Sequence, residues 1–253
     1  MNPFVRIVLG SAAALLTMAS HASLVEIKFE TRAIGIAGSP ALQAALARAG
    51  INVTPPPTII GEFHYEDSTP DANVNPSVGA YDGALDRLSF SVGSWFSQSL
   101  TNIALNGDIT VRNDVGAAVV DQVLVLVTGV GAQNAGFLGY SFFDPGLLPD
   151  ASDDVTWVLD QVSINLQIDP PGTTPSSWLV SDSLPTKSQW EEPLSTFTAR
   201  GVTLQFNPTG PGADESVTGV ITFLAVPEPG SVALLGVGLA GLAASRRRRN
   251  RAG

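Results

Sequence analysis

Histidine and cysteine, the side chains behind much of protein catalysis and transition-metal binding, are scarce in this chain. Its 253 residues include two histidines and no cysteine, so thiolate nucleophiles and thiolate zinc sites are excluded. His64 alternates with Glu62 and Glu66, which places all three on one face of an expected strand. Such a group would suit a general base or a metal site. We favour the simpler interpretation, which is a solvated strand face.

Carboxylates offer a second route to catalysis, because a glycosidase needs two carboxyl groups flanking a sugar. Glu191 and Glu192 follow Trp190, and an aromatic ring beside two acids is the most sugar-like combination in the sequence. An exposed acidic loop explains the same residues more simply, and we prefer it. The sequence has no Gly-x-Ser-x-Gly motif, which argues against a serine hydrolase, and no glycine-rich phosphate loop.

Calcium is the one ion that the sequence favours. Asp67 and Asp71 bound a loop rich in oxygen-bearing side chains, and Ca²⁺ prefers carboxylate and carbonyl oxygens. These two aspartates are our candidate ligands for a structural Ca²⁺, and no other cofactor is expected. Residues 81–86 and 150–154 have a similar composition, but none of the three segments matches the EF-hand pattern. Ordinary turns closed by aspartate side chains are the alternative, and the one that we favour.

The elements that must position these residues are mainly strands. Residues 24–31 alternate charged and apolar side chains with a period of two, as expected of a strand with one buried face. Residues 119–130 are strongly apolar, which predicts a strand that is buried on both faces. The other expected strands span residues 58–65, 85–96, 103–111, 136–143, 156–168, 197–206 and 217–223.

One short helix is expected at residues 40–49. Ser39 suits the N-cap, Pro40 suits the first helical position, and Gly50 suits the position just after the helix. Many strands separated by turns rich in Gly, Pro, Asp and Ser predict a mainly β domain. The expected fold is therefore a β-sandwich or a jelly-roll-like domain with one short helix.

Residues 1–22 have the features of a secretory signal peptide. Arg6 precedes an apolar run at residues 7–19, and small residues then lead to Ala22. We expect signal peptidase to cut between Ala22 and Ser23. A buried N-terminal helix is the alternative interpretation of the same residues.

The other end of the chain, residues 226–253, predicts a membrane-anchoring tail. Pro227, Glu228 and Pro229 form a stiff segment, because each proline fixes φ and removes a backbone donor. Residues 231–245 carry no charge and predict a membrane helix, shorter than the roughly 20 residues that usually span a bilayer. Long arginine side chains extend its reach by snorkelling, and such a basic cluster stays cytoplasmic. The cluster consists of Arg246, Arg247, Arg248, Arg249 and Arg251.

This order of Pro-Glu-Pro, apolar segment and arginine cluster resembles the PEP-CTERM sorting signal of Gram-negative bacteria. The resemblance implies that an exosortase recognises the tail, cuts near the Pro-Glu-Pro and passes the protein to the cell surface or the extracellular space. The inner membrane would then hold the protein only in transit. The resemblance also implies a connection with exopolysaccharide and biofilm. An ordinary C-terminal transmembrane anchor is the alternative.

The exported domain, residues 23–225, also resembles the extracellular part of many PEP-CTERM proteins. Residues 61–71 resemble a recurrent Gly-x-Phe-x-Tyr-Asp strand with an acidic turn after it, although Glu66 stands where aspartate is commoner. Residues 179–185 resemble a Ser-Asp-x-Leu-Pro loop of the same proteins. This second resemblance implies no particular activity.

The exported domain is far more acidic than the whole chain. The chain has 13 basic and 23 acidic residues, but six of the basic and one of the acidic residues lie in the two terminal segments. The domain itself therefore carries a net charge of −15. Such a domain repels nucleic acid and anionic membrane surfaces.

Two functions remain open for this domain. The first, which we prefer, is a non-enzymatic surface or matrix protein that contacts extracellular polysaccharide. The alternative is a secreted carboxylate-dependent polysaccharide hydrolase, which requires two acids facing each other in a cleft, one with a raised pKa. The binding hypothesis expects exposed tryptophans, and the candidates are Trp95, Trp157, Trp178 and Trp190.

Overall fold

The structure is a computed structural model. It describes residues 24–35, 40–52, 54–101, 107–115, 120–129, 138, 140–146, 154–169, 176–210 and 212–227. The predicted signal peptide with its Ala22–Ser23 cleavage site, the predicted membrane helix at residues 231–245 and the arginine cluster lie outside these residues. Within the described part of the chain, no helix combines the length and apolar character needed to span a membrane.

The described strands form a single antiparallel sheet. Its order is β3-β6-β7-β9-β10-β11-β1-β2-β4-β5, with β8 paired to β9 outside this path. The strands are β1 (Leu24–Gly35), β2 (Ile59–Glu66), β3 (Val78–Asp82), β4 (Leu85–Val92), β5 (Phe96–Thr101), β6 (Gly107–Val115), β7 (Val120–Thr128), β8 (Ser141–Asp144), β9 (Val155–Ile168), β10 (Ala199–Pro208) and β11 (Glu215–Ala225).

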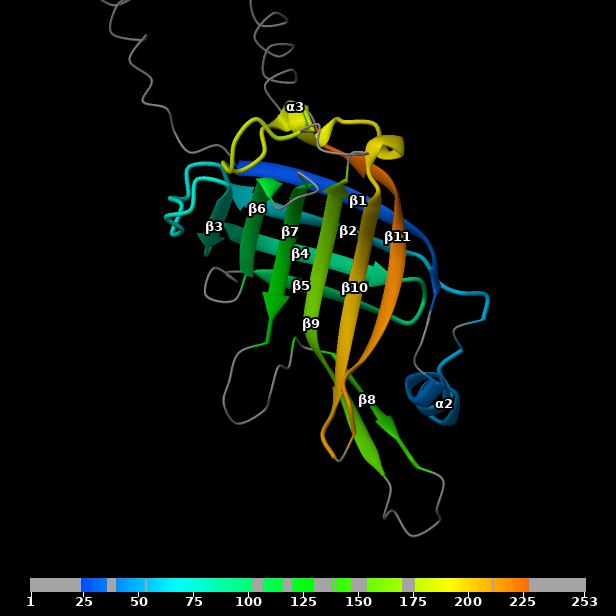
Figure 1. The fold of residues 1–253 in the computed structure, drawn as a ribbon. Coiled ribbons are helices and arrows are strands. Elements are labelled where there is room, and N and C mark those ends of the chain that lie inside the picture. The colour runs from blue at the N-terminus through cyan, green and yellow to red at the C-terminus, as the bar shows by residue number, and fades with distance from the viewer. Residues whose placement is uncertain are drawn as a thin grey trace, which may run out of the picture.

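This sheet curls until its two halves face each other. β2, β4 and β5 cross behind β6, β7, β9 and β10 (Figure 1), and β4 contacts β6 although the two are far apart in the strand order. Trp95, in the turn before β5, stacks on Phe206 of β10 with ring centroids 5.7 Å apart. The mainly β prediction is confirmed. Where a β-sandwich has two sheets, the described strands make one curled sheet whose halves enclose the core.

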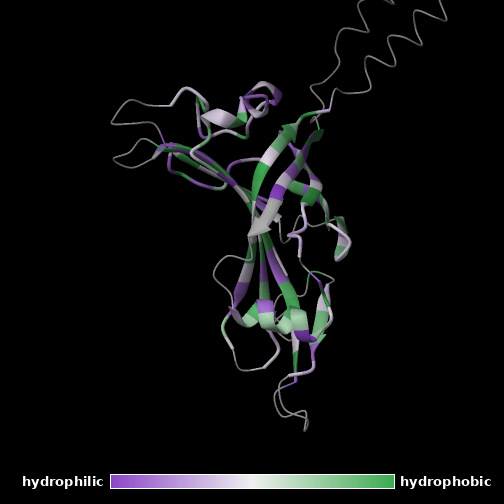
Figure 2. Cartoon of the chain, turned by 90° about the vertical axis from the view of Figure 1, so that its right-hand side faces the viewer, coloured by the Kyte–Doolittle hydropathy of each residue, from purple (hydrophilic) through white to green (hydrophobic). Residues whose placement is uncertain are grey.

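The core is built by the alternation of side chains along each strand. Apolar and polar residues follow one another along strands of the sheet (Figure 2). The buried apolar side chains form one core cluster between the two halves of the curled sheet. In β7 every second side chain is buried, from Asp121 to Val127, and those between are partly exposed. The prediction that this strand is buried on both faces is therefore wrong. Its outer face carries Gln122, which donates a hydrogen bond to Asn165 Oδ1 at 2.8 Å.

One predicted strand, residues 85–96, is two strands in the structure. β4 ends at Val92, and a turn with Gly93 at φ 49° reverses the chain into β5. A Cβ on Gly93 would lie 2.7 Å from Pro57 Cβ, so both the space and the backbone angle favour glycine here. β3 was not predicted, because its five residues lie within a stretch of turn-forming residues.

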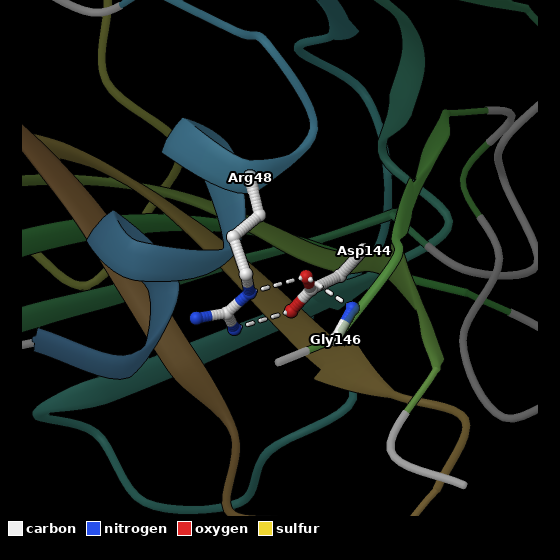
Figure 3. A network of polar contacts seen from close by, with 3 residues as sticks. All are labelled: Arg48, Asp144 and Gly146. Carbon is white, nitrogen blue, oxygen red and sulfur yellow. Dashed lines mark hydrogen bonds and ion pairs between the residues drawn. The ribbon is translucent and has the colours of Figure 1, made fainter. Parts of the chain in front are cut away.

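The predicted helix is confirmed as α2 (Pro40–Arg48). Gly50 has φ 73°, and the Ile51 and Gly50 N–H groups donate to the Leu46 and Ala47 carbonyls, which is a Schellman ending. An ion pair joins α2 to β8 (Figure 3): Arg48 Nε and Nη2 donate to the two oxygens of Asp144 at 2.8 and 2.7 Å.

The Arg48–Asp144 pair is a structural clamp. The Asp144 carboxylate is 3% exposed and also accepts a bond from the Gly146 N–H at 3.1 Å. The hydrogen bonds from Arg48 lower the pKa of Asp144, so the pair is charged at neutral pH.

Candidate functional site

The two segments that resemble recurrent PEP-CTERM sequences contact each other. The Tyr65 hydroxyl, from β2, donates to the Pro185 carbonyl, and the Trp190 indole N–H donates to the same hydroxyl at 2.7 Å. The Tyr81 hydroxyl donates to the Asp182 carbonyl at 2.9 Å. The side chains of Tyr65 and Trp190 are fully buried. These residues therefore hold the 176–198 segment, with α3 (Lys187–Trp190) and the 3-10 helix η1 (Leu194–Thr196), against the sheet.

Three of the four tryptophans are buried. Trp157, Trp178 and Trp190 are 7%, 5% and 1% exposed, and Trp95 is partly buried and packs against the core. The expectation of exposed tryptophans is therefore wrong for Trp157, Trp178 and Trp190. Burying the large indole ring in the core stabilises the fold more than leaving it on the surface. The loop-rich sequence around Trp178 and Trp190 does not indicate that these residues are buried.

Glu191 and Glu192, the acidic pair beside Trp190, do not form a two-carboxylate sugar site with the Trp190 ring. Glu191 is exposed and lies 3.8 Å from Lys187 Nζ, and Glu192 accepts a bond from the Thr196 hydroxyl. With the indole of Trp190 buried and pointing at Tyr65, the preferred interpretation of an acidic loop agrees with the structure.

The outer face of β1, β2, β4 and β5 carries a groove with a volume of about 690 Å³, and a hollow of about 310 Å³ lies beside α2. Two cross-strand pairs of serines line its β4 and β5 side, Ser89 with Ser99 and Ser91 with Ser97. Its β11, β1 and β2 side is lined by Phe223 and Ile60, each 51% exposed, and by Lys28, Glu30 and Glu62. Serine hydroxyls together with an exposed aromatic ring suit a ligand with many hydroxyl groups.

A charged cluster adjoins this groove through Glu62. The register of β1 and β2 pairs Glu26 with His64 and Lys28 with Glu62. The ligand atoms of Glu26, Glu62 and His64 all lie within 4.8 Å of one another. Lys28 Nζ lies 3.1 Å from Glu26 and 3.9 Å from Glu62, and the hydrogen bond to Glu26 is the main cause of its raised pKa.

His64 is itself buried among more exposed neighbours on this face, so the favoured interpretation of a solvated position is wrong for this residue. It is 8% exposed, and its Nε2 finds no hydrogen-bond partner among the described residues. The nearest carboxylate oxygen, from Glu62, is 3.7 Å away, which is too far for a hydrogen bond. Glu66 is exposed and lies outside the cluster. The third member is Glu26, whose place beside His64 depends on strand register, which single-sequence periodicity does not give.

The aspartates of the predicted calcium loop are engaged in turns. Asp71 Oδ1 accepts bonds from the N–H groups of Asn73 and Ala80, both at 2.8 Å. Asn73 and Asn75 close the next two turns in the same way. Asp67 is exposed. Calcium binding at Asp67 and Asp71 stays a prediction.

A second acidic pair, which the sequence analysis missed, lies where β9 bulges against β10. Asp160 is the residue skipped in the pairing of Gln205 and Phe206, and its Oδ1 is buried without a hydrogen-bond partner among the described residues. Burial, and then the charge of Asp214, raises the pKa of Asp160 to about 6. Gln205 Nε2 donates to Asp214 at 2.8 Å. Neither aspartate lines the serine groove.

The two ends of the described domain lie close together. β1 begins at Leu24 and pairs with β11, so that Lys28 lies opposite Ala225, the last residue of β11. Pro227 follows two residues later and is partly buried, and Val226 packs against the core. Glu228 and Pro229 lie outside the described residues. The predicted signal peptide and the predicted membrane tail therefore join the domain at the same end of the sheet.

The geometry defines a mainly β domain that is followed, directly after its last strand, by a proline-containing tail. Comparison with known families identifies the tail: residues 225–249 match the PEP-CTERM protein-sorting motif, as the sequence predicted. The motif indicates a protein that is exported to the cell surface and processed by an exosortase. No curated protein and no solved structure matches this chain.

Proposed function

We propose that this protein is a non-enzymatic cell-surface or matrix protein whose β domain binds extracellular polysaccharide in the serine groove. The sorting motif supports the destination. The observation that carries the binding role is the groove itself, a concave face of about 690 Å³ on a domain that the sorting motif directs outside the cell. Its association with exopolysaccharide and biofilm in a Gram-negative bacterium belongs to the same proposal.

The chemistry of the groove fits a sugar chain. Serine hydroxyls both donate and accept hydrogen bonds, as sugar hydroxyls do, and the four serines stand at the spacing of neighbouring strands. Phe223 and Ile60 offer apolar surface to the C–H face of a sugar ring. Lys28 adds a cation that would pair with an acidic sugar.

The test is binding of the producer's own polysaccharide to the full-length chain in detergent. Ser91→Tyr places a large ring in the groove, and Thr218→Tyr places the same side chain at an exposed position on β11 outside the groove lining. Ser91→Tyr should weaken binding by about tenfold or more, which corresponds to roughly 1.4 kcal/mol, whereas Thr218→Tyr should not change it. Equal affinities for the two variants would remove the groove from the account.

Export is tested separately in cells. A chain truncated after Ala225 lacks the sorting motif and should accumulate in the periplasm or inner membrane fraction, and cell aggregation should fall with it. Normal appearance of the truncated chain at the surface would contradict the role proposed for the tail.

A carboxylate-dependent hydrolase is the second candidate, and Asp160 with Asp214 is the observation that favours it. A carboxyl group with a pKa of about 6 beside a second carboxylate is the combination that a general acid and its partner require. Hydrolysis of the producer's polysaccharide that is lost in both Asp160→Asn and Asp214→Asn would support this candidate. Turnover by neither the wild type nor any variant would exclude it.

A further inference from the structure

We infer that Glu26, Glu62 and His64 form a binding site for a divalent transition-metal ion of the Zn²⁺ or Mn²⁺ class. The three ligand atoms converge within 4.8 Å of one another on the outer face of β1 and β2. One imidazole with two carboxylates is a mixed nitrogen and oxygen set that suits these ions better than Ca²⁺ or Mg²⁺. The site does not depend on polysaccharide binding.

His64 supplies an independent reason for a ligand at this position. Its side chain is nine-tenths buried, and its Nε2 lies 3.7 Å from a Glu62 carboxylate oxygen without a hydrogen-bond partner among the described residues. Buried polar atoms are rarely left unpaired, because they lose their hydrogen bonds to water and gain none in return. A cation held between Nε2 and the two carboxylates satisfies the imidazole and compensates both negative charges.

The geometry needs only small adjustments. Zinc bound at about 2.0–2.2 Å from each ligand brings the ligand atoms to roughly 3–3.5 Å from one another. The side chains of Glu26 and Glu62 are 33% and 30% exposed and can rotate, while buried His64 stays fixed. Three protein ligands leave at least one coordination position for water.

Lys28 is the competitor for this site. Its ammonium group lies 3.1 Å from Glu26 and 3.9 Å from Glu62, and its side chain is 48% exposed. A metal ion would displace it into solvent. Arg87, opposite His64 in the register with β4, is exposed. The positive charges of Lys28 and Arg87 oppose the binding of a metal cation, and Lys28 is the nearer of the two to the ligand oxygens.

Titration calorimetry of the full-length chain in detergent with Zn²⁺ tests the inference, and Co²⁺ serves as a spectroscopic probe. One site is expected, with affinity reduced at least about tenfold in Glu62→Gln and in His64→Gln. Glu66→Gln is the matched control, since it removes an exposed acid from the same face of the same strand, and it should bind as the wild type does.

Lys28→Gln provides a change in the opposite direction. Because it removes the competing cation, it should tighten Zn²⁺ binding about two- to fivefold. Lys28→Gln still tests the metal site if His64→Gln fails to fold, which circular dichroism would reveal. The inference is overturned if Zn²⁺ does not bind, if a folded His64→Gln binds as the wild type does, or if Lys28→Gln leaves the affinity unchanged.

Discussion

The contact between Tyr65, Trp190 and Pro185 leads to the sharpest stability prediction. Tyr65→Phe removes only the hydroxyl oxygen, which accepts a bond from the Trp190 indole and donates one to the Pro185 carbonyl. Trp190 is 1% exposed and Tyr65 is completely buried, so water does not replace the lost partner. Leaving one buried polar group unpaired costs about 1–3 kcal/mol, so two such groups predict a loss of about 2–6 kcal/mol.

Chemical unfolding in urea, followed by tryptophan fluorescence, measures this loss directly. Tyr81→Phe is the matched control, because it removes a hydroxyl that donates to the Asp182 carbonyl at a slightly more exposed position. It should lose about 1 kcal/mol.

A double-mutant cycle isolates the hydrogen bond itself. Once Trp190→Phe has removed the indole N–H, the further loss from Tyr65→Phe should shrink by about 0.5–3 kcal/mol. Our reasoning fails if Tyr65→Phe is no more destabilising than Tyr81→Phe, or if the two losses in the cycle simply add.

Three further predictions concern single residues. Asp144→Asn should lower the free energy of unfolding by about 1.5–3 kcal/mol at pH 7. Because Arg48 lowers the folded-state pKa of Asp144, this difference from the wild type should disappear as the pH falls well below about 4. Urea titrations at a series of pH values measure both effects. The pKa of Asp160 is shifted in the opposite direction, up to about 6. The stability that its protonated form provides at low pH is therefore lost as the pH rises through 6. Asp160→Asn should flatten this pH dependence and stabilise the protein by up to about 1 kcal/mol at pH 8. Gly61→Ala should cost about 1–3 kcal/mol in a thermal or urea melt, because its Cβ would lie 2.6 Å from the Ser89 carbonyl oxygen; wild-type stability of this variant would show that β2 and β4 move apart easily.

The strands and the sorting motif were predictable because their signals are local. The period of two at residues 24–31 identifies most of β1, the strand predicted at residues 156–168 matches β9 almost to its ends, and Gly50 marks the end of α2. The Pro-Glu-Pro segment needs no folded context, and its family comparison agrees.

Only some residues of the candidate sites could be predicted from the sequence, because strand register and side-chain burial arise from contacts between distant segments. Glu62 and His64 share a strand face in the sequence, but Glu26 joins them only through the pairing of β1 with β2. The burial of Trp190 depends on Tyr65, 125 residues away. The serine groove forms because β4 and β5 turn at Gly93, where the residue pattern predicts one continuous strand.

Hydrogen–deuterium exchange of the full-length chain, with and without saturating polysaccharide, tests the proposed binding site most directly. β5 is the last strand at its edge of the described sheet, so its outward N–H groups should exchange fast in the free protein. Bound polysaccharide should slow exchange in β4 and β5, which carry the serines of the groove, and leave β9 and β10 unchanged. Protection confined to β9 and β10, or no protection at a polysaccharide concentration that saturates binding, would contradict the assignment of the groove.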